Sequence, residues 1–297
     1  MLLTALLTVL LSLAPGLISS ETAEAPPPPA EVTVPLEAAT SGPRADDPPI
    51  LGADNPTRPL VVIDAGHGGR DAGARSSLDN KAEKEITLQL ARAIRDELIR
   101  SGRTRVALTR ANDEYIELRE RYEIARRLGA DLFISVHADA APLGGEARGA
   151  TIYTLSEVAS DREAALLAAE ENKSDVIGGV DLSGRNADVS MILIDLAQRE
   201  SMNVSADFAR LLMREASPFI PFRPEPHRFA AFIVLKAPDI PSILFETGYL
   251  TNPEDSAYIQ SPQGQQQIAA GMRRAIEAHF AKRMVRLAGR MEPIVGR

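Results

Sequence analysis

Short apolar runs alternate along this chain with stretches in which apolar residues recur every three to four positions. The runs are typical of buried β-strands, because strands of a sheet that is covered on both faces are apolar throughout. We expect strands at residues 60–63, 105–109, 132–137, 150–155, 232–235 and 242–246. The periodic stretches predict helices at residues 83–100, 115–129 and 265–283.

Strands that alternate with helices predict one α/β domain, over residues 60–283. We expect a three-layer architecture, in which helices flank a largely parallel, twisted sheet. Ligands bind at the carboxyl ends of the strands in such sheets. Residues 156–216 interrupt the alternation with a mostly helical pattern that glycines break, so they form a predicted helical insert.

The segments before and after this domain have different compositions. Residues 1–20 are apolar but broken at Pro15-Gly16, which favours a secretory signal peptide and leaves no transmembrane span in the mature chain. An ordinary N-terminal helix is the alternative, because no Lys or Arg precedes Arg44. Residues 21–59 are rich in proline and predict a disordered linker. Residues 284–297 carry no motif and predict a C-terminal tail.

Charge and cysteine content exclude some classes of function. The 33 Lys and Arg against 41 Asp and Glu give a net charge of -8, which argues against a general nucleic-acid-binding protein. There are no cysteines, so disulfides and thiolate metal ligands are excluded. Any bound metal must therefore be held by carboxylates and by some of the four histidines.

Three predicted strands end in residues that could hold a metal or carry a proton. His67 follows the first strand between glycines, His137 ends the strand 132–137, and Glu246 ends the strand 242–246. A catalytic zinc ion takes three protein ligands from His, Asp or Glu and keeps one open position. The third candidate ligand is Glu83, at the start of a predicted helix; the alternative is an acid that interacts only with the helix dipole.

Two aspartates stand beside these histidines in the sequence. Asp64 precedes His67 and Asp139 follows His137. A metal-bound histidine usually donates its other ring N–H to a carboxylate or a carbonyl. Asp64 and Asp139 are therefore candidates to orient the two rings, although each could equally be a turn residue.

Four separated segments resemble one enzyme family. They are residues 63–69 (Ile-Asp-Ala-Gly-His-Gly-Gly), 83–86 (Glu-Lys-Glu-Ile), 135–140 (Ser-Val-His-Ala-Asp-Ala) and 244–252 (Leu-Phe-Glu-Thr-Gly-Tyr-Leu-Thr-Asn). Their order and residues are similar to those of the zinc-dependent N-acetylmuramoyl-L-alanine amidases of the amidase_3 family, of the division-associated periplasmic type. The family usually has proline where this chain has Ala65.

The resemblance implies a function and a role for each site residue. By it, His67, Glu83 and His137 hold one Zn²⁺ per chain, and Glu246 is the catalytic acid and base. The implied reaction is hydrolysis, by zinc-activated water, of the amide between the lactyl group of muramic acid and L-alanine in peptidoglycan. It would serve cell-wall remodelling and daughter-cell separation in the periplasm. The alternatives are a zinc peptidase that cuts the stem peptide and a degenerate, non-catalytic wall-binding module.

The predicted insert also has a counterpart in division-associated members of the family. The resemblance implies that its helix covers the active-site cleft and that Glu171, or else Glu170, fills the open position on zinc. It further implies autoinhibition that a LytM-type activator protein relieves by binding the insert. The alternative is a surface helix with solvated acids. The apolar segment 189–196 could be either core or a docking surface. His227 is expected in a surface loop, and His279 is expected to have a structural role in the last helix.

Overall fold

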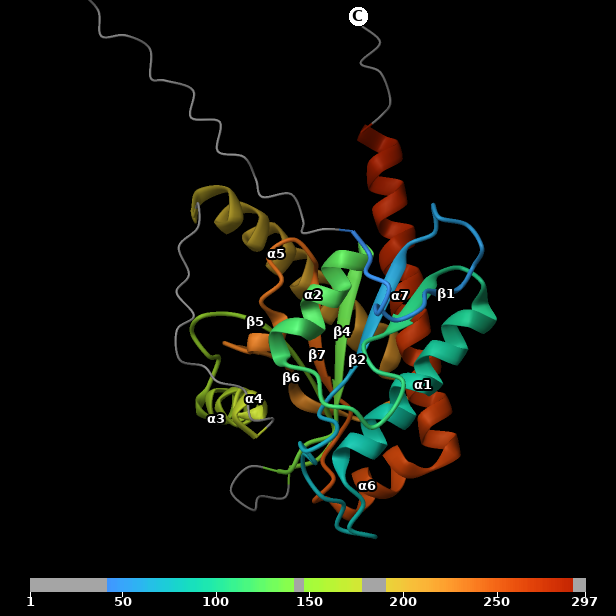
Figure 1. The fold of residues 1–297 in the computed structure, drawn as a ribbon. Helices are drawn as coiled ribbons and strands as arrows, with labels where there is room; N and C mark the ends of the chain where they lie inside the picture. Colours follow the sequence, from blue (N-terminus) through green and yellow to red (C-terminus); the bar gives the residue numbers. More distant parts are fainter. Residues whose placement is uncertain (1–41, 142–146, 178–190, 291–297) are drawn as a thin grey trace, which may run out of the picture. The chain divides into compact units, whose positions relative to one another are not determined.

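A seven-stranded sheet forms the middle layer of the fold in the computed structural model, which describes residues 42–141, 147–177 and 191–290 (Figure 1). Its strands, in spatial order, are β1 (Leu51–Gly52), β3 (Arg105–Leu108), β2 (Leu60–Ala65), β4 (Leu132–His137), β7 (Ser242–Glu246), β5 (Ala150–Leu155) and β6 (Phe222–Ala230). The central strands β3, β2, β4 and β7 are parallel, whereas β1 runs antiparallel to β3 and β5 antiparallel to β7.

Helices cover both faces of this sheet. The first face carries α1 (Glu83–Ser101), α5 (Met191–Ala216) and α7 (Pro262–Arg290). The second face carries α2 (Leu118–Leu128), α3 (Arg162–Glu171) and the 3₁₀ helix η2 (Ile233–Leu235). Alternate residues of a strand point to opposite faces, so Val61 and Ile63 join the core below α1 while Val62 joins the core below α2. The three-layer α/β prediction is confirmed, with antiparallel pairs added on both sides.

The region before the last strand differs from the prediction. Residues 222–230, expected to hold a proline-rich turn, form β6, and the expected strand at 232–235 is largely η2. Proline is tolerated in β6 because this strand lies at the edge of the sheet, where one side needs no ladder hydrogen bonds. Residues 232–235 are apolar because Phe232, Val234 and Leu235 pack in the second core, not because they are extended.

The predicted helical insert is divided between the two faces. Its first part forms α3 and the short α4 (Ser174–Ile177), whereas the end of α5 packs into the first core through Phe208, Leu212 and Ala216. The end of α5 therefore contributes one buried face to the domain core. The segment 189–196 lies outside the residues whose side chains are described, so its two alternatives stay open. Helix α7 extends to Arg290, through half of the predicted tail.

Part of the predicted linker is folded onto the domain. Strand β1 pairs with β3, and the carboxylate of Asp47 accepts hydrogen bonds from Nε and Nη2 of Arg127, at 3.1 and 2.7 Å. The prediction of disorder is thus wrong for residues 42–59, because the Asp47–Arg127 ion pair, a weaker pair of Arg44 with Glu120 and a short strand hold a segment with little apolar surface. Residues 1–20 and 21–41 lie outside the described residues. Within the described ranges, no helical segment has the length and hydropathy that crossing a bilayer demands.

The Asp47–Arg127 ion pair predicts a stability effect. Asp47→Ala removes a side chain that is 3% exposed and leaves part of the Arg127 guanidinium without its partner, so we expect the free energy of unfolding to fall by about 1–3 kcal/mol. Urea denaturation of the full chain measures this. The exposed neighbour Asp46 provides the control, and equal effects of Asp46→Ala and Asp47→Ala would show that this segment is not part of the folded unit.

Candidate metal centre and active site

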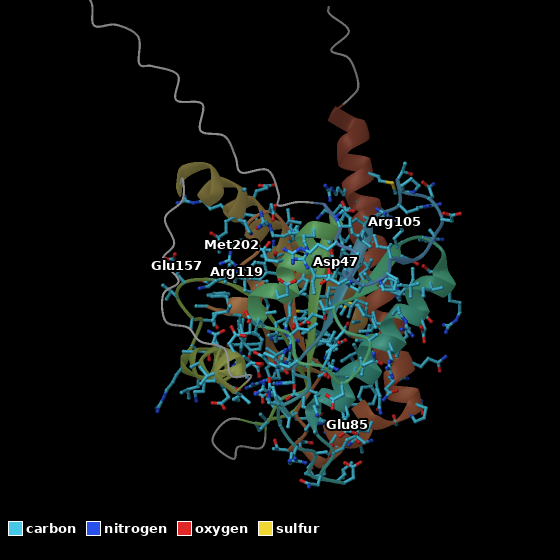
Figure 2. All side chains as sticks on the ribbon, viewed as in Figure 1. Asp47, Glu85, Arg105, Arg119, Glu157 and Met202 are labelled. Atoms are coloured by element: carbon cyan, nitrogen blue, oxygen red, sulfur yellow. The ribbon has the colours of Figure 1, made fainter. Side chains whose placement is uncertain are left out.

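The carboxyl ends of β2, β4 and β7 meet at one edge of the sheet, at the lower end in Figure 1. His137 and Glu246 end their strands as direct register partners. His67 lies two residues beyond the end of β2, and Glu83 begins α1. Figure 2 labels Glu85, which is exposed near the start of α1, whereas Glu83 is fully buried.

The turn after β2 aims the His67 ring at this edge. His67 has a left-handed backbone (φ 61°), a conformation that is uncommon outside glycine and costs of order 1 kcal/mol. The carboxylate of Asp71 contacts its Nδ1 at 2.9 Å, which leaves Nε2 facing inward. Gly66 permits the close approach of the second ring, since a Cβ there would lie 2.4 Å from Nε2 of His137.

Both histidine rings face the same carboxylates. The distance from His67 Nε2 to Glu83 Oε2 is 3.0 Å, and that from His137 Nδ1 to Glu83 Oε1 is 3.3 Å. Glu171 Oε2 lies 3.3 Å from His137 Nδ1 and 3.8 Å from His67 Nε2. The donor atoms of His67, His137 and Glu171 all lie within 4.8 Å of one another. These three side chains and that of Glu83 are buried.

The two inward ring nitrogens suit a metal ion. His67 Nε2 and His137 Nδ1 are buried, and neither has a hydrogen-bond partner among the described residues. Buried polar atoms without partners are rare and costly, and two that converge on a carboxylate are of the residue types that zinc takes as ligands. The Glu83 carboxylate is held in place, since its oxygens accept the backbone N–H groups of Ala74 and Ala138.

Glu246 lies next to this cluster with one oxygen unused. Its Oε2 accepts the backbone N–H of Asp139 at 3.1 Å, and its buried Oε1 has no partner among the described residues. Burial raises the pKa of Glu246 well above its usual range, and the charges of Asp139 and Glu83 raise it further. Burial likewise raises the pKa of Asp139 to about 8, together with the charges of Glu83 and Glu171. A carboxyl with a raised pKa is suited to proton transfer near neutral pH.

Asp64 does not orient His67. Its carboxylate accepts hydrogen bonds from Thr109 Oγ1 (2.6 Å), Ser135 Oγ (2.7 Å) and Arg121 Nη1 (3.0 Å). Asp71, four residues after His67, takes the place that the sequence suggested for Asp64. Asp139 meets the site through its backbone N–H to Glu246, and the described residues contain no hydrogen bond between its carboxylate and His137.

Two buried arginines shape the turn and were not anticipated from the sequence. Arg121 donates to the carbonyls of Ala65 and His67, and Arg110 donates to those of Ala65 and Gly66. Burial lowers the pKa of Arg110 to about 10, with the charge of Arg121 contributing. Arginine is otherwise seldom buried, and no sequence pattern indicated which of the many arginines turn inward.

Glu171 reaches the site from the end of α3, while Glu170 does not. Glu170 is exposed and pairs with Lys173 at 2.7 Å, so of the two predicted acids it is Glu171 that faces the histidines. Burial raises the pKa of Glu171. The residues that follow hold this end of α3 in place: Asn172 bonds the backbone of Ala231 and Ile233, and Asp175 accepts from Tyr115 Oη.

The other two histidines lie apart from this cluster in the structure. His227 lies within β6 rather than in a loop, with Nε2 3.0 Å from Thr154 Oγ1. His279 is a buried residue of α7 whose ring packs against that of Phe208 at a centroid distance of 5.4 Å.

The ion pair of Asp64 with Arg121 predicts a second stability effect. Asp64→Ala leaves the guanidinium of Arg121, which is 1% exposed, without its carboxylate. We expect the free energy of unfolding to fall by about 3–5 kcal/mol, measured by urea denaturation. Asp96→Ala removes an exposed partner of Arg95 and should change it by less than about 0.5 kcal/mol. Similar small losses in both variants would contradict a structural role for the buried pair.

Comparisons with known proteins agree with this arrangement. A family model described as N-acetylmuramoyl-L-alanine amidase matches residues 61–278. The chain is 35% identical over 241 residues to the N-acetylmuramoyl-L-alanine amidase AmiC of Escherichia coli O6:H1, covering 80% of this chain and 57% of AmiC. It is 35% identical over 222 residues to AmiA of Salmonella typhimurium, covering 74% of this chain and 76% of AmiA. The chain thus spans little more than half the length of AmiC.

The fold is also found in a solved structure. The catalytic domain of CwlV, an N-acetylmuramoyl-L-alanine amidase from Bacillus (Paenibacillus) polymyxa var. colistinus, superposes with a TM-score of 0.56. The match covers 75% of this chain and 98% of that domain at 24% sequence identity, which establishes similarity of fold alone.

Proposed function

This chain belongs to the N-acetylmuramoyl-L-alanine amidase family, and on that premise we propose that it hydrolyses the amide between muramic acid and L-alanine in peptidoglycan. The observation that carries the proposal is the convergence of His67 Nε2 and His137 Nδ1, both buried and without hydrogen-bond partners among the described residues, on the carboxylate of Glu83. Glu246 lies beside them with a free buried oxygen.

In this proposal His67, Glu83 and His137 hold one Zn²⁺ per chain. The residue types and the unpartnered ring nitrogens fit that ion. A zinc ion bound there would supply a Lewis acid able to polarise the amide carbonyl and to lower the pKa of water to near 7. Asp71 keeps the His67 ring in the binding orientation through Nδ1.

Glu246 is the proton carrier of the proposed reaction. Its Oε1 accepts a proton from the attacking water, while the backbone N–H of Asp139 holds Oε2 in place. The same carboxyl then donates the proton to the nitrogen of L-alanine, which otherwise leaves poorly as an amide anion. One carboxyl with a raised pKa can perform both transfers.

We further propose a place and a regulation for this activity. Residues 1–20 act as a signal peptide, and the catalytic domain 60–283 acts in the periplasm, in cell-wall remodelling and daughter-cell separation. Glu171 would compete with water and substrate as a ligand of the zinc ion, since its Oε2 lies 3.3 Å from His137 Nδ1. A LytM-type activator protein that binds the insert would displace α3, a two-state change of a covering segment.

Glu246→Gln tests the assignment of the proton carrier. We expect the rate of peptidoglycan hydrolysis to fall by roughly 10²–10⁴-fold while zinc stays bound, because the amide cannot accept the water proton. Glu254→Gln, an exposed glutamate that pairs with Arg148, is the matched control.

Product analysis of the same digests distinguishes the candidate reactions. The amidase leaves free muramic lactyl groups and intact stem peptides, whereas a stem-peptide peptidase leaves cut peptides. No turnover by the wild-type chain, with or without α3 displaced, would favour the wall-binding module. Full activity of Glu246→Gln would exclude Glu246 as the proton carrier.

Glu171→Ala tests the proposed autoinhibition. Removal of the competing carboxylate should raise basal hydrolysis by roughly 5- to 150-fold, the range of a switch worth 1–3 kcal/mol. Glu170→Ala is the matched control, because that neighbour is exposed and faces away from the histidines. An unchanged basal rate in Glu171→Ala would reject the autoinhibition.

A further inference from the structure

A row of polar side chains crosses the sheet from the candidate metal centre to the outer strand β6. Glu246 of β7 is the register partner of Thr151 in the neighbouring strand β5. Tyr153, two residues further along β5 and on the same face, pairs with Leu244 of β7 on one side and with Arg228 of β6 on the other. Neighbouring strands are about 4.8 Å apart, so β6 lies about 10 Å from the strand that carries Glu246. This surface lies under α3.

Two arginines at the far end of this row hold one carboxylate. Glu163, in the first turn of α3, accepts hydrogen bonds from both Arg223 and Arg228. Arg223 Nη2 and Arg228 Nη1 lie 3.1 and 2.7 Å from Oε2, and Arg223 Nη1 bonds Oε1. Tyr249 Oη lies 3.4 Å from the same Oε1. Burial would raise the pKa of Glu163, but the two guanidinium groups hold it at about 2.

This arrangement is a receptor for a carboxylate. Two guanidinium groups with a two-pronged contact from one of them form the strongest and most directional anion contact that side chains offer. The Arg228 side chain is 11% exposed and that of Arg223 is 16% exposed, so the pair faces a partly desolvated site rather than open water.

The sheet surface between the metal centre and the arginines, here called the floor, carries hydrogen-bonding atoms that have no partner in the part of the chain that the structure describes. Thr151 Oγ1, Tyr153 Oη and Arg228 Nε are all buried and lack partners among the described residues. Each such group costs stability of order 1–3 kcal/mol. An ion pair that only fastened α3 to β6 would not need these atoms. They remain as unused donors and acceptors beside the arginines, which a polar ligand along the row could use.

Helix α3 presents two carboxylates to the two ends of this floor. Glu171 reaches the histidines and Glu163, eight residues earlier, reaches the arginines. At 1.5 Å per residue the two positions are about 12 Å apart along the helix. An extended peptide spans about 3.3–3.6 Å per residue, so 12 Å corresponds to about three residues.

We propose that Arg223 and Arg228, together with Tyr249, form a subsite for a carboxylate of the stem peptide, on the second or third residue after the scissile amide. Glu163 fills this subsite while α3 covers the cleft, as Glu171 fills the metal end. Helix α3 thus imitates the substrate at two points. The inference deepens the proposed amidase function and rests on it for the identity of the peptide.

The test uses the full chain with Glu163→Gln as background, since this change removes the carboxylate charge that competes for the arginines. Two variants are compared in that background: Arg223→Gln, and Arg214→Gln as a control at an exposed arginine of α5. The substrates are synthetic muramoyl peptides in pairs, which differ only in a free or amidated carboxyl on the second residue, or on the third.

We expect the background and the Arg214→Gln variant to prefer one acidic substrate over its amide by at least roughly tenfold in kcat/KM. In the Arg223→Gln variant that ratio should fall to near one, mostly through the rate on the acidic substrate. An equal rate on both members of both pairs in the background would overturn the subsite, and so would an unchanged preference in Arg223→Gln. Either result would leave the amidase function intact.

A binding measurement separates failure of the subsite from failure of the function. Calorimetry with the free stem peptide needs no turnover, and the acidic peptide should bind the background at least roughly tenfold tighter than its amide. Loss of this difference in Arg223→Gln supports the subsite even if no muramoyl amide is hydrolysed. Absence of hydrolysis in a background that also carries Glu171→Ala would reject the amidase function. If Arg223→Gln does not fold, as judged by circular dichroism, Arg223→Lys is used in its place. The lysine keeps the positive charge but should weaken the preference for the acidic substrate, because it cannot make the two-pronged contact.

Discussion

Two imidazole nitrogens, His67 Nε2 and His137 Nδ1, are buried without hydrogen-bond partners among the described residues, and they face the carboxylate of Glu83. A fold tolerates such groups only where a ligand or strong local charge compensates them. The left-handed backbone at His67 is a second cost that this edge of the sheet bears. Both costs fall at the place where strands of an α/β sheet position a ligand, and the proposed cation would compensate the two ring nitrogens.

The surrounding structure serves to hold those groups in one arrangement. The buried Asp64–Arg121 ion pair ties β2 to α2, and the guanidinium of Arg121 then binds the carbonyls of the His67 turn. On the same face of the sheet as α2, Glu163 contacts the arginines of β6 and Glu171 contacts the histidines, so two carboxylates of α3 reach this region. The fixed part of the site therefore rests on buried charge pairs within the domain. Helix α3 is held by apolar packing of Ala164, Leu167 and Ala168 as well as by these two carboxylates, and an acidic ligand could replace only the carboxylate contacts.

The buried strands and the functional residues at their ends were predictable from the sequence. The edge strand β6 and the side-chain contacts around the histidines were not. Buried strands such as 132–137 are apolar runs with a definite end, so His137 could be placed at the edge of the sheet. The proline-rich strand β6 was missed because local proline content says nothing of an edge position. Asp71 was missed in favour of Asp64 because the path of a glycine-rich turn decides which acid meets a ring, and that path depends on the buried Arg110 and Arg121.

The central claim is that His67, Glu83 and His137 form a zinc site, and the metal content of the purified chain tests it most directly. Elemental analysis of the full chain after dialysis against zinc and then buffer should give one zinc per chain. His67→Ala and His137→Ala should each lose that zinc, whereas His227→Ala, in β6, should retain it. A wild-type chain that binds no zinc, or a His67→Ala/His137→Ala double variant that still holds one zinc ion, would contradict the account.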